Sequence, residues 1–304
     1  MLAPVTGPVI EVRNLTKSYG DVEAVKGIDL QVREGEIFAL LGPNGAGKTT
    51  TVEILEGHRP RSSGEVSVLG FDPGAGGSRF RERIGIVLQE TGVEPYLTVS
   101  EAVDLFRGYY PNPRPVDEIV RLVGLEDKRD ARVSKLSGGQ QRRLDVAIGL
   151  AGNPDLLFLD EPTTGFDPSA RRQAWTIVRD LAREGKTVFL TTHYMDEAQF
   201  LADRVAIIVG GRIIAEGPPG ALAAEHLGAT AIGFGLPEGR SLPEDLAADA
   251  TFSGTLVELT TNDPVGTLNR LTSWALTEKV ELQGLSVGRP SLEDVYLDLT
   301  KASS

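Results

Sequence analysis

The sequence predicts an α/β protein built around a phosphate-binding loop and followed by a small α+β domain. The loop is the glycine-rich run Gly-Pro-Asn-Gly-Ala-Gly-Lys-Thr-Thr at residues 42–50. An apolar stretch at 36–41 precedes it as an expected buried strand, and residues 51–56 follow it as an expected helix. The order strand, glycine loop, helix is the context that a phosphate-binding loop requires.

The loop is suited to holding the phosphates of a nucleotide. Its glycines allow backbone shapes and close approaches that a Cβ would block, so that successive N–H groups and a helix N-terminus form an anion cradle. Lys48 is expected to reach the β- and γ-phosphates, and the Thr49 hydroxyl to bind Mg²⁺. A glycine-rich turn that matches by accident is the alternative. The residues expected to bind nucleotide are Gly42, Pro43, Asn44, Gly45, Ala46, Gly47, Lys48, Thr49 and Thr50.

Composition excludes several classes of function. The 304 residues carry a net charge of −12, which disfavours a nucleic-acid partner bound through phosphate neutralisation. The absence of cysteine excludes disulfides and thiol catalysis, and fits a reducing compartment. We expect no signal peptide, and the longest apolar runs, such as 205–209, fall far short of the roughly 20 residues that span a membrane. A membrane role must therefore come through a partner.

Two domains are expected, at residues 1–220 and 221–304, because composition shifts at the Gly-Pro-Pro-Gly run 217–220. The first contains a helical insert at about 90–150, interrupted by prolines. The second is expected to serve as a packing or dimerisation module. Strands are expected at 9–12, 28–32, 37–41, 64–69, 84–88, 156–159, 187–191, 231–236, 256–259 and 280–287, a hairpin at 205–215, and helices from 137, 168, 264 and 291.

Two adjacent carboxylates, Asp160 and Glu161, follow the apolar strand 156–159. In parallel α/β sheets the carboxyl ends of the strands form the edge that binds ligands. Asp160 could therefore hold the shell of Mg²⁺, and Glu161 could polarise a water for in-line attack. The alternative is an acid pair that only caps a loop.

The run Leu-Ser-Gly-Gly-Gln at 136–140 is a second candidate surface for phosphate. Ser137 and Gln140 fit a capping box, which is a purely structural explanation. Gly138 and Gly139 need another reason, because glycine in a helix costs up to about 1 kcal/mol relative to alanine. Bare backbone at a helix N-terminus suits an anion. One nucleotide could hardly use both this surface and the phosphate-binding loop of the same chain.

The chain resembles ATP-binding cassette (ABC) ATPases over about residues 8–217. The resemblance rests on motifs that follow one another in the order of that family: 42–49, Gln89, 136–140, 156–161, Asp167 and His193. The resemblance implies a P-loop NTPase core with an antiparallel β subdomain and a helical insert. It also implies a head-to-tail homodimer that sandwiches two ATP molecules. Each ATP would lie between the phosphate-binding loop of one chain and Ser137, Gly138 and Gly139 of the other.

Other positions take their roles from the resemblance. Tyr19 resembles the aromatic residue that stacks on adenine, and Gln89 the glutamine that senses Mg²⁺ and joins the helical insert. Asp167 resembles the subunit-contact loop, although it is equally explained as a helix N-cap. His193 resembles the switch that contacts the γ-phosphate. Together with the roles given above to Lys48 and Glu161, this makes Glu161, His193 and Lys48 the expected catalytic residues. Taken alone, a tyrosine, glutamine, aspartate or histidine at such a position usually has only a structural role.

Two segments, 89–101 and 290–300, resemble ATPase subunits of bacterial ABC-2-type exporters, a group that includes the daunorubicin-resistance type. This resemblance implies ATP hydrolysis coupled to export of a drug, lipid or antibiotic-like substrate. An integral membrane permease of ABC-2 type would be the partner, at the inner face of the cell membrane. The alternatives are a soluble ABC ATPase of DNA repair or ribosomes, and a nucleotide-gated scaffold without turnover. Phe166 stands where the family commonly has leucine.

Overall fold

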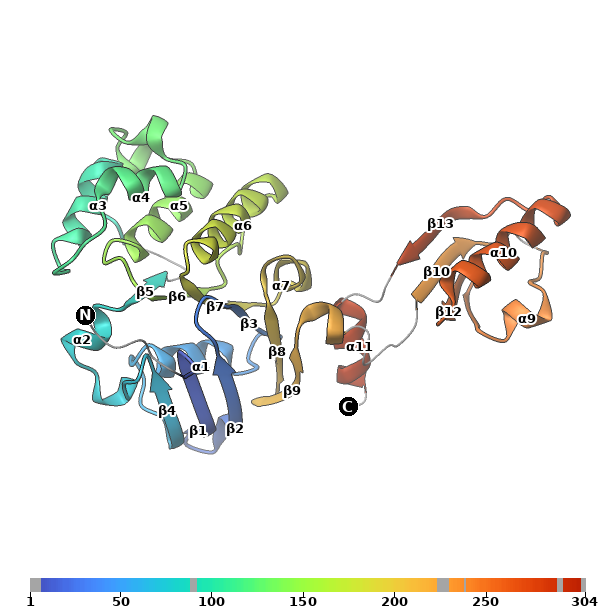
Figure 1. Cartoon of the computed structure of the whole chain (residues 1–304), viewed down its shortest axis with the longest axis horizontal. Coiled ribbons are helices and arrows are strands. Elements are labelled where there is room, and N and C mark those ends of the chain that lie inside the picture. The colour runs from blue at the N-terminus through green and yellow to red at the C-terminus, as the bar shows by residue number, and fades with distance from the viewer. Residues whose placement is uncertain (1–6, 88–91, 223–229, 238, 289–291, 302–304) are drawn as a thin grey trace. The chain divides into compact units, whose positions relative to one another are not determined.

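The computed structural model describes residues 7–87, 92–222, 230–237, 239–288 and 292–301 (Figure 1). The chain divides into two compact units, Met1–Pro218 and Pro219–Ser304, and each is described by itself. No helix among the described residues combines the length and the apolar character needed to cross a bilayer.

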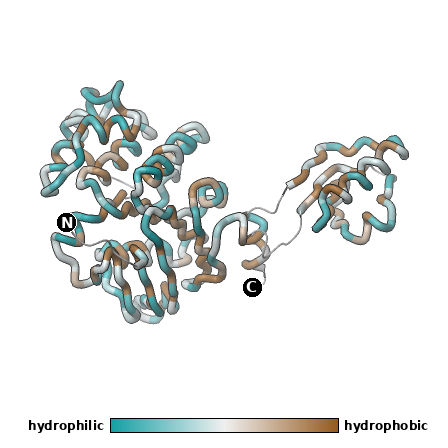
Figure 2. Tube along the Cα trace, viewed as in Figure 1, coloured by the Kyte–Doolittle hydropathy of each residue, from teal (hydrophilic) through white to brown (hydrophobic). Residues whose placement is uncertain are grey.

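The first unit is organised by a six-stranded sheet whose strands are all parallel to their neighbours except at one edge, where the last strand is antiparallel. Its two central strands, 37–41 and 187–192, are buried at every position, as expected for a parallel sheet covered on both faces. In Figure 2 the strands of this unit carry hydrophobic stretches. The order across the sheet is β5 (Ile84–Val87), β6 (Leu156–Asp160), β7 (Thr187–Thr192), β3 (Ile37–Leu41), β8 (Arg204–Val209) and β9 (Arg212–Gly217).

A three-stranded antiparallel sheet lies beside it, with β1 (Ile10–Tyr19) between β2 (Val22–Val32) and β4 (Ser63–Val68). The first two strands are longer than expected, because their ladder continues through polar residues with shifts of register. Helix α1 (Lys48–Leu55) contributes its apolar side chains to a core shared with strands of both sheets. It starts earlier than the expected 51–56, so that Lys48 stands in its first turn.

Helices cover the rest of the first unit. Three of them, α3, α4 and α5, pack on one another in the part of the chain expected to be a helical insert. Two short helices, α2 and α7, were not expected, because so few residues show no helical period. The helices after α1 are α2 (Ser78–Arg81), α3 (Val99–Arg107), α4 (Val116–Leu122), α5 (Gly138–Gly149), α6 (Pro168–Arg183) and α7 (Met195–Leu201).

The second unit is an antiparallel sheet in the order β11, β12, β10, β13, with a core that includes Ile232, Phe234, Leu259 and Leu271. Its elements are β10 (Thr230–Gly235), α9 (Glu244–Ala247), β11 (Ala250–Ser253), β12 (Leu256–Thr261), α10 (Pro264–Glu278), β13 (Gln283–Gly288) and α11 (Leu292–Lys301). The prediction placed the start of the last strand too early, at 280, whereas β13 starts at Gln283. Val280 belongs instead to the end of α10, where its N–H donates to the Ala275 carbonyl (2.8 Å).

Candidate active site

The phosphate-binding loop owes its shape to its own packing. Gly47, the N-cap of α1, has a φ of +104°, and a Cβ there would lie 2.5 Å from the Ala24 carbonyl oxygen. A Cβ on Gly42 would lie 2.3 Å from the carbonyl oxygen of Ile208. Both positions therefore require glycine even before a ligand is considered.

Lys48 is buried beneath this loop, with 4% of its surface exposed. Its Nζ donates to the carbonyl oxygens of Gly42 (2.8 Å) and Pro43 (3.2 Å), and lies 3.3 Å from Glu161 Oε1. An ammonium group has three N–H donors, so these contacts occupy all of them. A phosphate bound by Lys48 must take one of these places.

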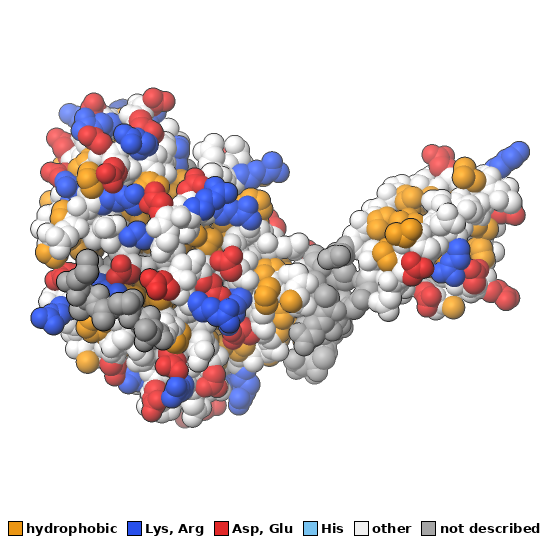
Figure 3. All heavy atoms as spheres, viewed as in Figure 1, with side chains coloured by type: hydrophobic (Ala, Val, Ile, Leu, Met, Phe, Trp, Pro, Cys, Tyr) orange, Lys and Arg blue, Asp and Glu red, His pale blue; other side chains and the backbone are white. Residues whose placement is uncertain are grey.

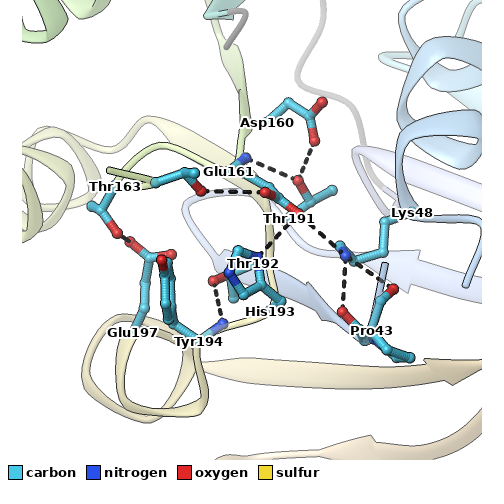
Figure 4. A network of polar contacts seen from close by, with 12 residues as sticks. Pro43, Lys48, Asp160, Glu161, Thr163, Thr191, Thr192, His193, Tyr194 and Glu197 are labelled. Atoms are coloured by element: carbon cyan, nitrogen blue, oxygen red, sulfur yellow. Dashed lines mark hydrogen bonds and ion pairs between the residues drawn. The ribbon is translucent and has the colours of Figure 1, made fainter. Parts of the chain in front are cut away.

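The three residues expected to be catalytic meet at the carboxyl ends of β3, β6 and β7 (Figure 4). Glu161 Oε1 lies 3.3 Å from Lys48 Nζ and 3.2 Å from His193 Nδ1. Burial opposes ionisation of Glu161, but the hydrogen bond of His193 and the charge of Lys48 outweigh it and lower the pKa of this carboxyl. Glu161 is therefore an ionised acceptor at neutral pH.

The backbone of Glu161 is strained. Its φ of +46° lies in the left-handed region that side chains other than glycine seldom occupy. The Glu161 N–H donates to the Thr191 carbonyl (3.2 Å) and hydroxyl (3.1 Å), which holds this conformation against β7. Such strain persists where the surrounding structure over-determines it, often at functional sites.

Asp160 and Thr49 offer the oxygen ligands that Mg²⁺ prefers. The Asp160 carboxylate accepts a hydrogen bond from the Thr191 hydroxyl, and burial raises the pKa of Asp160 although that bond and Lys48 oppose the rise. Thr49 is exposed in the first turn of α1. No cluster of three or more His, Cys, Asp or Glu in the described part of the chain could hold a metal. A lone carboxylate with a hydroxyl fits Mg²⁺, which usually takes its remaining ligands from phosphates and water. Gln89 lies outside the described residues.

The turn at Ser137 has the expected capping box. The Ser137 N–H donates to Gln140 Oε1 (2.9 Å), and the Gln140 N–H donates to Ser137 Oγ (3.4 Å). Ser137 and Gly138 are exposed at the start of α5. A hollow of about 580 Å³ lies beside them, and the described residues that line it include Gly139, Gln140, Phe166 and Asp167 but none of 42–50.

Asp167 and Tyr19 are the remaining expected binding residues. Asp167 caps α6, because its Oδ1 accepts from the N–H groups of Ser169 (2.8 Å) and Ala170 (2.9 Å). Tyr19 ends β1 with 40% of its surface exposed. Cationic groups of Lys17 and Arg59 lie 5.0 and 5.3 Å from the centre of its ring. Its aromatic face is accessible but lies beside positive charge.

Arg142 is a residue of this site that the sequence did not point to. It is buried in α5, where its Nε donates to the Pro162 carbonyl (3.1 Å) and its Nη2 to the Asp160 carbonyl (3.3 Å). It also pairs with Asp145 at 3.6 Å. Arg142 thus ties α5 to the backbone on both sides of Glu161. Among the charged residues of a helix, the sequence carries no signal for one that turns inward.

Comparisons with known proteins identify the family of the chain. A family model described as "ABC transporter" matches residues 25–164. Another, described as "ABC transporter domain-containing protein-like, C-terminal domain", matches residues 230–291. The Nod factor export ATP-binding protein I of Ralstonia nicotianae is 40% identical over 303 residues, which cover 96% of this chain and 94% of that protein. The protein of the same name from Rhizobium sp. (strain N33) is 40% identical and covered to 96% in both chains.

Solved structures give the same picture. A dimeric post-hydrolysis ATP-binding cassette bound to ADP and Pi matches with a TM-score of 0.61 and 28% identity, over 69% of this chain and 98% of that one. CbiO1 of Clostridium perfringens, part of the ABC transporter complex CbiONQ, matches with a TM-score of 0.64 and 30% identity, over 72% of this chain and 92% of that one.

The fold and the loop define a P-loop ATPase, and the expected α/β fold class is confirmed. The chain belongs to the ABC transporter family as one of its ATP-binding proteins. It binds ATP and is an ATPase.

Proposed function

We propose that this chain is the ATP-hydrolysing subunit of an ABC exporter, bound at the inner face of the membrane to a separate integral membrane permease. The observation that carries the proposal is the meeting of Lys48, Glu161 and His193 at one sheet edge. Export is supported by 40% identity, over 96% of the chain, to proteins named for Nod factor export. The finer assignment to ABC-2-type drug exporters rests on segments 89–101 and 290–300, and the permease selects the substrate.

The chemistry follows from the hydrogen bonds of Lys48. When the γ-phosphate takes an N–H of Lys48, the contact of Lys48 with Glu161 is given up. Glu161 then accepts a proton from the attacking water, while His193 donates to a phosphate oxygen. Mg²⁺, held by Asp160, Thr49 and Gln89, would neutralise charge on the β- and γ-phosphates.

Two copies complete the site. We infer a head-to-tail homodimer in which Ser137, Gly138 and Gly139 of one chain contact the ATP held by residues 42–50 of its partner. The turn is exposed, and the hollow beside it is lined by none of the chain's own residues 42–50; both observations support this arrangement. Asp167 would contact the other subunit, and Tyr19 would stack on adenine.

Glu161→Gln tests the hydrolytic role. The amide cannot take a proton from water, so we expect ATP binding to persist while phosphate release falls by about a hundredfold or more. ATP should then accumulate in a dimer, which light scattering measures. Glu65→Gln changes an exposed glutamate of β4 and serves as the control. A wild-type rate of phosphate release in Glu161→Gln would remove Glu161 from this role.

A further inference from the structure

Glu197 is a buried carboxylate that the proposed mechanism does not use. It lies in α7, four residues after His193, and none of its surface is exposed. Burying a carboxylate is costly unless it is well hydrogen-bonded. Burial raises the pKa of Glu197, although hydrogen bonds from neighbouring side chains oppose the rise. A group maintained at this cost needs an explanation.

Two side chains from different parts of the chain donate hydrogen bonds to one oxygen of Glu197. Figure 4 shows one of them, Thr163, beside Glu197. The Thr163 hydroxyl donates to Glu197 Oε1 at 2.8 Å, and Trp175 Nε1 donates to the same oxygen at 2.9 Å. Thr163 follows β6 and is 1% exposed, and Trp175 in α6 is 8% exposed. Glu197 thus joins α7, α6 and the segment after β6.

The Thr163–Glu197 hydrogen bond closes a ring of residues that includes Glu161 and His193. Glu161 and His193 face each other at 3.2 Å, one after β6 and the other after β7. The chain runs two residues from Glu161 to Thr163, and four from His193 to Glu197. The two segments meet again at the bond between Thr163 and Glu197. A shift of either segment would therefore change the separation of Glu161 and His193.

The segment after β7 has supports of its own. The Tyr194 N–H donates to the Thr192 hydroxyl (2.9 Å), and the Tyr194 ring lies 4.1 Å from the His193 ring. The Arg171 guanidinium of α6 lies 4.3 Å from the Tyr194 ring. Glu197 adds what these local contacts lack, which is a direct link to the segment that carries Glu161.

We propose that Glu197 is a positioning residue for ATP hydrolysis, holding Glu161 and His193 at their working separation through Thr163 and Trp175. This inference rests on the proposed roles of Glu161 and His193. Glu197 itself touches neither of the reacting groups in our mechanism. It acts indirectly, because its hydrogen bond to Thr163 fixes segment 161–163 relative to segment 193–197.

Removal of the Thr163 hydroxyl tests the link with the smallest change of shape. Thr163→Val should lower kcat by about tenfold and leave the KM for ATP unchanged, because small misplacements affect the chemical step more than binding. Thr267→Val is the matched control, since Thr267 is also buried and shares a 2.8 Å hydrogen bond with Thr261 in the second unit. An unchanged kcat in Thr163→Val would overturn the proposal.

Substitutions of Glu197 separate hydrogen bonding from charge. Glu197→Gln keeps a carbonyl oxygen for both donors, so we expect nearly wild-type kcat. Glu197→Leu leaves both donors without an acceptor and should lower kcat at least as much as Thr163→Val. The fluorescence of Trp175, in a Trp274→Phe background that removes the other tryptophan, reports whether the packing persists. A wild-type kcat in Glu197→Leu would contradict the inference.

A double-mutant cycle with His193→Ala distinguishes positioning from general support of the fold. If Thr163 acts through the pair of Glu161 and His193, adding Thr163→Val to His193→Ala lowers the residual kcat no further. A second, independent tenfold loss would overturn this inference alone. A wild-type kcat in His193→Ala would instead remove His193 from the proposed function and the inference with it.

Discussion

At the scale of single residues, carboxylates in similar surroundings acquire different chemistry from their neighbours. Glu161 lies beside Lys48 and His193, which lower its pKa despite burial. Glu56, at the end of α1, is 4% exposed, and burial together with the charges of Asp160 and Glu53 raises its pKa to about 8. The fold therefore keeps one carboxyl ionised and the other protonated near neutral pH.

Glu56 makes stability depend on pH. Its pKa in the folded chain, about 8, lies above the ordinary value of 4.5, so its stabilising contribution is complete below pH 4.5 and disappears as pH rises through 8. We expect Glu56→Gln to flatten the decline in the free energy of unfolding over this window. Denaturant titrations at several pH values measure it, with Glu65→Gln as the exposed control. The same slope in Glu56→Gln and the wild type would contradict this assignment.

At the scale of elements, helix caps combine stability and function. Asp167 caps α6 beside the turn at Ser137, and Asp263 caps α10 in the second unit by accepting from the Gly266 N–H (3.0 Å). Both caps satisfy N–H groups that a helix cannot pair internally. Only the first lies where the proposed dimer interface would form.

Asp167→Ala and Asp263→Ala should each cost about 1 kcal/mol of stability in their own unit. Trp175 and Trp274 lie one in each unit, so fluorescence in Trp274→Phe and Trp175→Phe backgrounds can follow the first and the second unit in turn. We expect only Asp167→Ala to lower ATP hydrolysis as well. Equal rates of hydrolysis in the two variants would limit Asp167 to its structural role.

The sequence predicted the elements that adjoin a motif. The strand before residue 42, the cap and helix at Ser137, and the helix after Asp167 all follow from local chemistry. Short elements such as α7 and β11 were not predicted, because so few residues show no hydrophobic periodicity. The extent of β1 depends on pairing with distant strands, which no local pattern records.

The candidate site was predicted unevenly for a related reason. Lys48, Asp160 and Glu161 follow motifs whose spacing implies their neighbours, and the structure places them together. Two residues were missed: Arg142, which contacts the backbone on both sides of Glu161, and Glu197, for which we propose a positioning role. In sequence both look like ordinary charged residues of exposed helix faces, and only tertiary packing turns them inward.

On the scale of the whole molecule, surface charge does not divide the first unit into single-sign fields. On the face shown in Figure 3, basic and acidic side chains are interspersed over this unit. The net charge of −12 is therefore a property of the total rather than of one visible patch on that face. The homodimer proposed above would therefore depend on local shape and on specific contacts such as those of the turn at Ser137.

Mixing of inactive variants tests the shared site. Lys48→Ala disables the phosphate-binding loop and Gly139→Val the turn at Ser137, so each homodimer should be inactive. A mixed head-to-tail dimer retains one intact site. An equal mixture should therefore recover about a quarter of the wild-type phosphate release, since roughly half of the dimers are mixed and each has one working site.

The control mixture combines Lys48→Ala with Glu161→Gln. Both changes fall on the same side of the site, so no combination restores it, and we expect no recovery. Recovery in the control, or none in the first mixture, would contradict the head-to-tail arrangement.

The left-handed backbone at Glu161 lowers the stability of the fold at a position where we propose a catalytic side chain. Glycine tolerates a φ of +46° without steric conflict, so Glu161→Gly should relax the turn while removing the carboxylate. Glu161→Ala is the reference, because both variants lose the carboxylate and its contacts with Lys48 and His193. Glu161→Gly should melt at a higher temperature than Glu161→Ala, because alanine keeps the Cβ that makes this φ unfavourable. A side chain at this position costs the fold stability that glycine would save, and the role proposed for Glu161 in hydrolysis accounts for a glutamate here.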